Sequence, residues 1–133
     1  MKRCQVMAWL VLGCGFGACA VGYEPARVSH SRPLTSGDFE QVAVVLRDRY
    51  GGLLVSDQES FRLQTEWSLF QRGGTPGRRR ATVYRGEDEQ LRVLVEVCYT
   101  RLGYGGLPEV TPVAGDLRAE EELAGVLERA LAN

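Results

Sequence analysis

The sequence is poor in the residue types on which catalysis and charge-based recognition most often depend. Among its 133 residues it has one histidine, His30, and one lysine, Lys2. A phosphate-binding loop of the G-x-x-x-x-G-K-[ST] type needs a lysine after its glycines, so the sequence has no such loop. Its 16 basic and 17 acidic residues leave a net charge of −1, which excludes the strongly positive surface typical of proteins that bind nucleic acid.

A long hydrophobic run is also missing. The apolar stretch 6–21 has 16 residues, and a helix of that length measures about 24 Å at about 1.5 Å per residue. A transmembrane helix needs about 20 residues to cross a bilayer comfortably, so this stretch is short for one. As an uncleaved anchor it would have to thin the membrane or tilt little. The composition is otherwise average, with 44% hydrophobic and 25% charged residues, and indicates one folded domain.

The N-terminus has the pattern of an export signal. Lys2 and Arg3 precede an uncharged stretch that continues to Glu24, and a short basic start followed by an apolar core is typical of a secretory signal peptide. Its end fits ordinary signal peptidase, because Ala18 and Ala20 frame an A-x-A site.

The residues Gly-Phe-Gly-Ala-Cys at 15–19 also resemble a bacterial lipobox, in which small and apolar residues precede an obligatory cysteine. This resemblance to bacterial lipoproteins covers residues 1–19. It implies that the Cys19 thiol carries a diacylglyceryl group, that the chain is cut before Cys19, and that the new amino group is acylated, for example with palmitate. Cys14, at the end of Val-Leu-Gly-Cys, is the alternative anchor, and secretion without lipid is the third reading.

Lipidation would decide where the protein acts. Acyl chains contribute about 0.8 kcal/mol per buried CH₂, so two or three chains form an effectively permanent anchor. The resemblance therefore implies a membrane-anchored protein of the cell envelope that faces the periplasm or the exterior. The predicted organisation is a signal peptide at 1–18, the lipidated cysteine and a flexible tether at 19–34, and a single domain at 35–133.

Caps and periodicity predict the elements of this domain. Thr35 and Ser36 supply N-cap oxygens for a helix over 37–50, whose apolar residues recur at helical spacing. Asp116 caps a last helix with a clean apolar stripe. Period-two alternation predicts strands between the helices, and the Gly- and Pro-containing segment 102–115 is predicted to be a loop. The predicted strands are 61–69, 79–86 and 91–99, with a short additional strand at 53–55.

The short links between these strands require antiparallel neighbours. The order α-β-β-β-α predicts an α+β fold, a two-layer sandwich with a three-stranded, or with 53–55 four-stranded, antiparallel sheet and both helices on one face. Alternation places Phe70, Leu94 and Cys98 on the opposite face. The strand with Thr-Glu-Trp at 65–67, followed by an arginine-rich strand, resembles the small helix-grip domains of periplasmic lipoproteins over about residues 50–100.

Three features are candidates for chemistry. The run Arg78, Arg79 and Arg80 is either a solvated strand start that discourages edge pairing or an anion contact, because guanidinium groups bind phosphates and carboxylates bidentately. His30 falls in the predicted tether, where no neighbours would hold it for catalysis or metal binding. Cys98 lies in mid-strand, with no histidine nearby in sequence to activate it.

The sequence contains no recognisable catalytic motif or metal-ligand cluster, so we expect a protein that is not an enzyme and needs no cofactor or metal. The sequence favours an exported, lipid-anchored binding or scaffolding domain that has an envelope protein partner and does not bind nucleic acid. The alternatives are a periplasmic carrier of a small apolar ligand, held near Trp67 and Tyr99, and a secreted protein without lipid.

Overall fold

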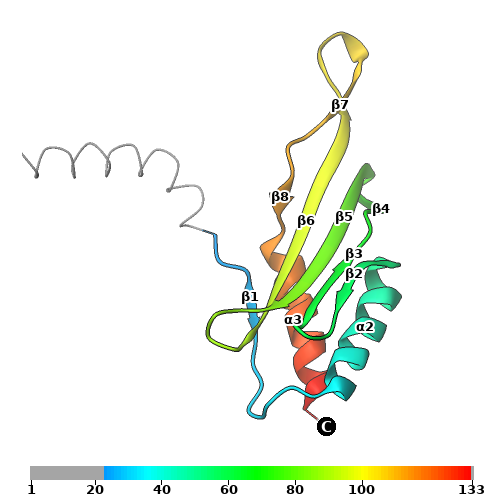
Figure 1. Ribbon diagram of the computed structural model, residues 1–133. Coiled ribbons are helices and arrows are strands. Elements are labelled where there is room, and N and C mark those ends of the chain that lie inside the picture. The colour runs from blue at the N-terminus through cyan, green and yellow to red at the C-terminus, as the bar shows by residue number, and fades with distance from the viewer. Residues whose placement is uncertain (1–22, 133) are drawn as a thin grey trace, which may run out of the picture.

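The computed structural model describes residues 23–132, which form an α+β fold of two helices and an antiparallel sheet of eight strands (Figure 1). The helices are α2 (Ser36–Tyr50) and α3 (Leu117–Leu131). A short 3-10 helix, η1 (Tyr104–Gly106), lies between the last long strand and the strand after it. The strands are β1 (Ala26–Val28), β2 (Leu53–Asp57), β3 (Arg62–Thr65), β4 (Ser68–Arg72), β5 (Thr75–Arg85), β6 (Leu91–Leu102), β7 (Pro108–Val110) and β8 (Ala114–Gly115).

The sheet is built around the long pair β5 and β6. Its order is β1-β6-β5-β3-β2, while β4 also pairs with β5, and β7 and β8 also pair with β6. The predicted central meander is present, but the predicted total of three or four strands is wrong. Part of the reason is that β1, β7 and β8 have only two or three residues each, which is too few to show a period in the sequence. The segment predicted as a loop over 102–115 contains two of these short strands.

The other reason is that the predicted strand 61–69 is two strands, β3 and β4, which both pair with β5. Between them Oγ1 of Thr65 accepts a hydrogen bond from the Ala81 N–H at 3.0 Å. The N–H of Glu66 instead donates to the Gly52 carbonyl oxygen at 2.8 Å. A side chain thus replaces one bond of the strand ladder, and the positions that face the helices change from odd numbers in β3 to even numbers in β4.

Both predicted helices are confirmed, and their ends follow from their caps. Oγ1 of Thr35 accepts from the Asp38 N–H at 3.2 Å, and the Asp38 carboxylate accepts from the Thr35 N–H at 2.8 Å, which is a reciprocal capping box. Helix α2 ends at Gly51, whose φ of 95° suits glycine. Asp116 caps α3 by accepting from the Ala119 N–H at 3.2 Å.

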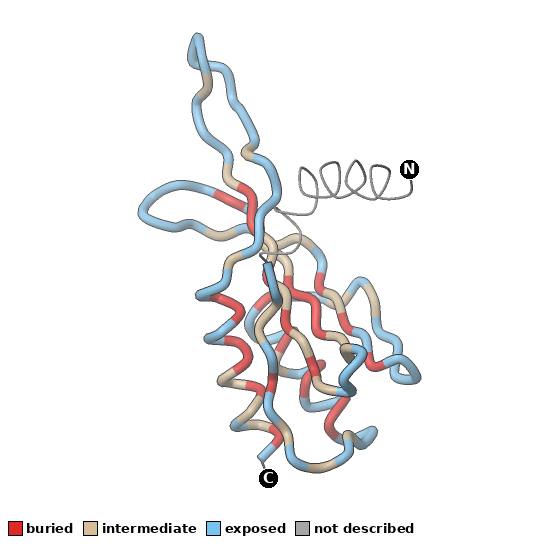
Figure 2. The backbone as a smooth tube through the Cα atoms, turned by 90° about the vertical axis from the view of Figure 1, so that its left-hand side faces the viewer, coloured by how far each residue is buried: buried red, intermediate tan, exposed pale blue. Residues whose placement is uncertain are grey.

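The helices pack against the sheet and enclose one hydrophobic core, which Figure 2 shows as the buried positions of both layers. Phe39 of α2 meets Phe61 edge to face, with ring centroids 5.3 Å apart. Burial of each large apolar side chain contributes about 1.5–3 kcal/mol. The largest fully buried apolar side chains are Leu46, Leu63, Leu91, Leu123, Leu127, Val28, Val42, Val83, Val93 and Val95.

Residues 23–34, expected to be part of a flexible tether, belong to the fold. Strand β1 pairs with β6, and Val28 is fully buried. Farther along, both Nη atoms of Arg32 donate to the Asp38 carboxylate, at 2.6 and 2.7 Å, and Nη2 also donates to the Leu131 carbonyl oxygen at 3.1 Å. One arginine therefore fastens the N-terminal segment to the start of α2 and the end of α3.

Glu120 is a fully buried residue of α3 whose carboxyl group joins three parts of the fold. Its Oε1 accepts hydrogen bonds from the Tyr23 hydroxyl and from the Val95 N–H, the latter at 3.0 Å. Val95 lies between the stretches of β6 that pair with β1 and β8, so the carboxyl group takes the place of a strand partner. Burial raises the pKa of Glu120, and burial together with the hydrogen bond to Glu120 raises the pKa of Tyr23.

Replacing Glu120 by alanine tests this role. We expect Glu120→Ala to lower the free energy of unfolding by about 3 kcal/mol, because a buried N–H and a hydroxyl lose their acceptor. Glu120→Gln keeps an acceptor oxygen and should cost less. Urea unfolding measures the difference, and Glu121→Ala, at an exposed position of the same helix, should stay within about 0.5 kcal/mol of the wild type. An equally small effect of Glu120→Ala would contradict the assignment.

The hydrogen bonds from Arg32 lower the pKa of Asp38 from 3.8 to about 2. Since the folded pKa lies below the unfolded value, this carboxylate stabilises the fold above about pH 4, and its contribution is lost as the pH falls toward 2. We expect Asp38→Asn to lower the free energy of unfolding by about 2 kcal/mol at pH 7 and to remove this part of the acid dependence. Denaturant unfolding between pH 2 and 7 measures both. The control Asp48→Asn, at an exposed position of α2, should keep the acid dependence of the wild type.

Candidate functional site

The run Arg78, Arg79 and Arg80 lies inside β5 and not at its start. Because side chains alternate along a strand, Arg79 lies on one face of the sheet and Arg78 and Arg80 lie on the other. Arg80 lies on the face away from the helices, where it is 2.8 Å from Oε1 of Glu96 and its guanidinium carbon is 4.6 Å from the centre of the Trp67 ring. Arg78 is exposed on the same face. Arg79 is the residue of this run that points to the helix side.

Two aromatic rings hold Arg79. Its guanidinium carbon is 4.7 Å from the ring centroid of Tyr50 and 5.2 Å from that of Phe70, within the range of cation–π attraction. Its Nη2 approaches the carbonyl oxygen of Arg49 at 3.4 Å. Within residues 23–132, its buried Nε has no hydrogen-bond partner and no carboxylate pairs with the side chain. Among the described residues, this cation is thus fixed in position without a counter-charge.

Arg79 lines a pocket of about 510 Å³ at the place where the two helices end and the sheet continues. Helix α2 contributes its C-terminal end, α3 its first turns, and β4 and β5 one arginine each. We call this cavity the arginine pocket. Its lining residues are Arg49, Tyr50, Arg72, Arg79, Asp116, Arg118, Ala119 and Glu122.

Four arginines and two carboxylates give the arginine pocket a positive balance. Arg72 pairs with Asp116 at 2.5 Å, and Arg118 pairs with Glu122 at 3.2 Å. Burial alone would raise the pKa of Asp116, but the hydrogen bond and the charge of Arg72 together with the backbone N–H groups at the start of α3 outweigh burial and lower this pKa, so the carboxylate stays ionised at neutral pH. The other two arginines of the pocket have no carboxylate partner in the described part of the chain.

An aromatic row next to Arg79 crosses three strands. Phe70, Gly77 and Tyr99 face one another in register, and the two rings lie 5.6 Å apart. A Cβ atom on Gly77 would lie 2.7 Å from the Cys98 carbonyl oxygen and 2.9 Å from the Phe70 ring, so glycine is required for this contact. The predicted placement of Phe70 on the face away from the helices is wrong, because the break between β3 and β4 reverses the alternation.

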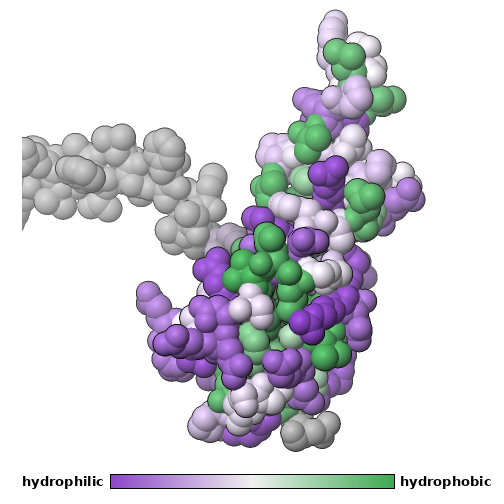
Figure 3. All heavy atoms as spheres, turned by 45° about the vertical axis from the view of Figure 1, so that its right-hand side comes forward, coloured by the Kyte–Doolittle hydropathy of each residue, from purple (hydrophilic) through white to green (hydrophobic). Residues whose placement is uncertain are grey.

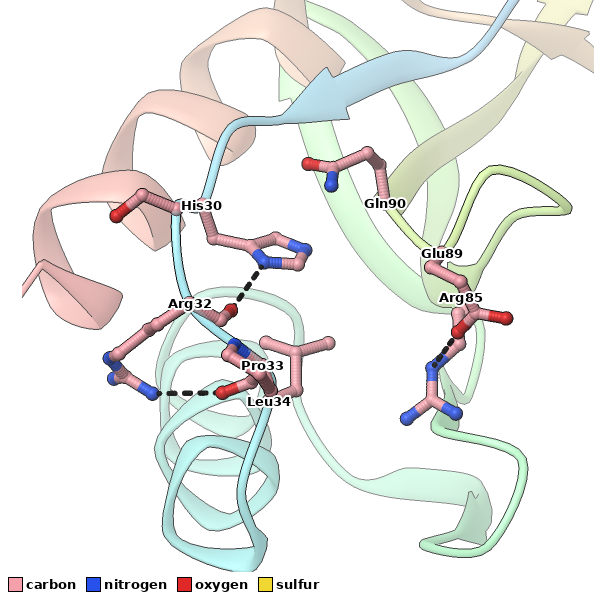
Figure 4. A pocket seen from close by; sticks show the side chains of 8 residues that line it. His30, Arg32, Pro33, Leu34, Arg85, Glu89 and Gln90 are labelled. Carbon is pink, nitrogen blue, oxygen red and sulfur yellow. Dashed lines mark hydrogen bonds and ion pairs between the residues drawn. The ribbon is translucent and has the colours of Figure 1, made fainter.

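A second pocket, of about 570 Å³, lies beside the segment after β1 (Figure 4). There Nδ1 of His30 is 3.0 Å from the Arg32 carbonyl oxygen, a contact that assigns the ring hydrogen to Nδ1. The buried Nε2 has no partner among residues 23–132. The ring points into the pocket toward the turn that carries Glu89 and Gln90. His30 is therefore held by its surroundings and does not lie in a flexible tether.

The two long strands continue beyond the helices and end in what we call the distal hairpin, residues 100–110, at the top of Figure 1. Apolar side chains lie on its surface among polar ones (Figure 3), and Leu102, Tyr104, Leu107 and Val110 are exposed, Tyr104 completely. The two charged residues of the distal hairpin form an ion pair at 3.5 Å. The segment therefore presents an apolar surface without net charge.

The remaining sequence candidates are spread over the molecule. Cys98 is a free, buried cysteine. Trp67 and Tyr99 lie on opposite faces of the sheet, next to Arg80 and Phe70 respectively, so they share no pocket. Cys14 and Cys19 lie outside the described residues. Among residues 23–132 there is no group of three or more side chains suited to hold a metal ion, and no helix is long and apolar enough to span a membrane.

No protein-family model matches the chain, and no curated protein matches it.

Proposed function

We propose that the chain is an exported, lipid-anchored and non-catalytic binding domain of the bacterial cell envelope, and that it engages a protein partner through the distal hairpin. The observation that carries the proposal is the exposure of four large apolar side chains on one protruding hairpin. Clustered exposed apolar side chains of this kind are typical of interaction sites, and tyrosine is among the residues that most often contribute binding energy at interfaces.

The distal hairpin is an ordered element. Pairing of β6 with β7 aligns Thr100 with Val110 and Leu102 with Pro108. At the tip, the Gly103 N–H donates to the Leu107 carbonyl oxygen at 2.7 Å. A pre-ordered hairpin loses little conformational entropy on binding. Because its charges are already paired with each other, the matching partner surface is an apolar groove and not a charged one.

The position of the first described residue bears on the anchor. If Cys19 carries the lipid, three residues separate it from Tyr23, which is held by Glu120. A chain spans at most about 3.6 Å per residue, so the domain would lie within roughly 15 Å of the anchored cysteine. The proposed domain therefore works close to the bilayer surface and not at the end of a long tether.

The anchor is tested by growth of a bacterium that expresses the chain with radioactive palmitate. We expect label on the wild type and on Cys14→Ala, and none on Cys19→Ala, because the thioether can form only on the cysteine at the cleavage site. Loss of label on Cys14→Ala alone would move the anchor to Cys14. Absence of label on every form would remove the lipid anchor from the proposal.

The distal hairpin is tested by a photo-reactive amino acid in place of Tyr104, with the same substitution at Leu54 as the control, because Leu54 is exposed but lies in β2. After irradiation of whole cells we expect a discrete protein adduct at position 104 and none at position 54. The double variant Tyr104→Ala, Leu107→Ala should weaken the interaction by more than about tenfold, since two apolar contacts are lost. Cross-linking to lipid alone would exclude a protein partner at this hairpin.

A further inference from the structure

We propose that the arginine pocket binds a dianionic phosphate group. This inference depends neither on the lipid anchor nor on the distal hairpin. It rests on the position and charge of the arginines that line the pocket, and above all on Arg79.

Arg79 has the features of a ligand-binding cation. The rings of Tyr50 and Phe70 lie within cation–π distance of its guanidinium carbon, and in the described part of the chain it has no carboxylate partner. A partly desolvated charge is costly unless an opposite charge compensates it. Its planar fork of N–H donors matches the oxygens of a phosphate. Because the two rings and the Arg49 carbonyl oxygen already hold the side chain, little rotamer entropy is lost on binding.

The charge of the arginine pocket favours a dianion over a monoanion. Asp116 and Glu122 neutralise Arg72 and Arg118. Arg49 and Arg79 are the two lining arginines without a carboxylate partner in the described part of the chain. Their two positive charges are matched by a phosphate, which carries about −1.5 to −2 at neutral pH. A single carboxylate would match only one of them. The volume of about 510 Å³ exceeds that of a phosphate ion, so the phosphate can belong to a small phosphorylated molecule or to a lipid headgroup.

Arg78 supplies a matched control for Arg79, because it is adjacent in sequence and carries the same charge but lies on the opposite face of β5.

Isothermal titration calorimetry of the full chain in neutral detergent, with inorganic phosphate as the probe, should give saturable binding at one site. Acetate at the same ionic strength should bind at least about tenfold more weakly. Arg79→Ala and Arg49→Ala should each weaken phosphate binding by about tenfold or more, as expected for a lost charge-assisted contact, while Arg78→Ala stays within about twofold.

Arg49→Ala keeps the test valid if Arg79→Ala fails to fold, because Arg49 is exposed and its carbonyl contact to Arg79 is unaffected by the substitution. Equal losses in Arg78→Ala and Arg49→Ala would reduce the effect to general electrostatics and overturn the proposal. So would the absence of saturable binding, or equal affinity for acetate. A water-soluble short-chain phosphatidate identifies the source: tighter binding than inorganic phosphate supports a lipid headgroup, and equal or weaker binding supports a soluble phosphorylated ligand.

Discussion

The fold depends on a buried carboxyl group, because Glu120 completes the hydrogen bonding of β6 where strand pairing is interrupted. At Val95 the N–H donates to Glu120, and the carbonyl oxygen accepts from the Asp116 N–H at 2.8 Å. The start of α3 thus acts as a strand partner for one residue. Since Glu120 also accepts from the Tyr23 hydroxyl, the same group fixes the N-terminal segment. The carboxyl group gives the Val95 N–H the acceptor that strand pairing does not supply there, and a buried N–H left without a partner is costly.

This arrangement determines where the helix layer stops. Helix α3 must begin beside Val95 in order to bond it, whereas β6 continues to Leu102 and β5 begins as far out as Thr75. The outer part of the sheet therefore has no helix above it. At the boundary, helix ends and strands together form the arginine pocket, and beyond it the distal hairpin projects with its apolar side chains uncovered. Both proposed contact regions result from a sheet that is longer than the helices that cover it.

The elements that could be predicted are those whose cause is local. Thr35 and Asp116 cap the helices with their own side chains. The alternation along 91–99 predicts β6 correctly because buried and less buried side chains alternate along nearly all of this stretch. The elements that were missed have distant causes. The N-terminal segment is held by Arg32, whose partner Leu131 is at the other end of the chain. Likewise, β5 begins before the predicted residue 79 because its first residues pair with β4. The whole arginine run therefore lies inside the strand, and its side chains are divided between the two faces.

The break between β3 and β4 has the largest consequence for the proposed phosphate site. If the alternation of 61–69 had continued unbroken, Phe70 would lie on the face away from the helices, and Arg79 would keep only Tyr50 beside it. Instead the hydrogen bond from the Ala81 N–H to the Thr65 hydroxyl interrupts the ladder and shifts the alternation. Phe70 then meets Tyr99 across Gly77 on the same side as Arg79. A single bond between a side chain and the backbone thus places the Phe70 ring beside Arg79, an arginine that has no carboxylate partner within residues 23–132. For this reason neither the charge run nor the strand pattern alone could indicate the proposed site.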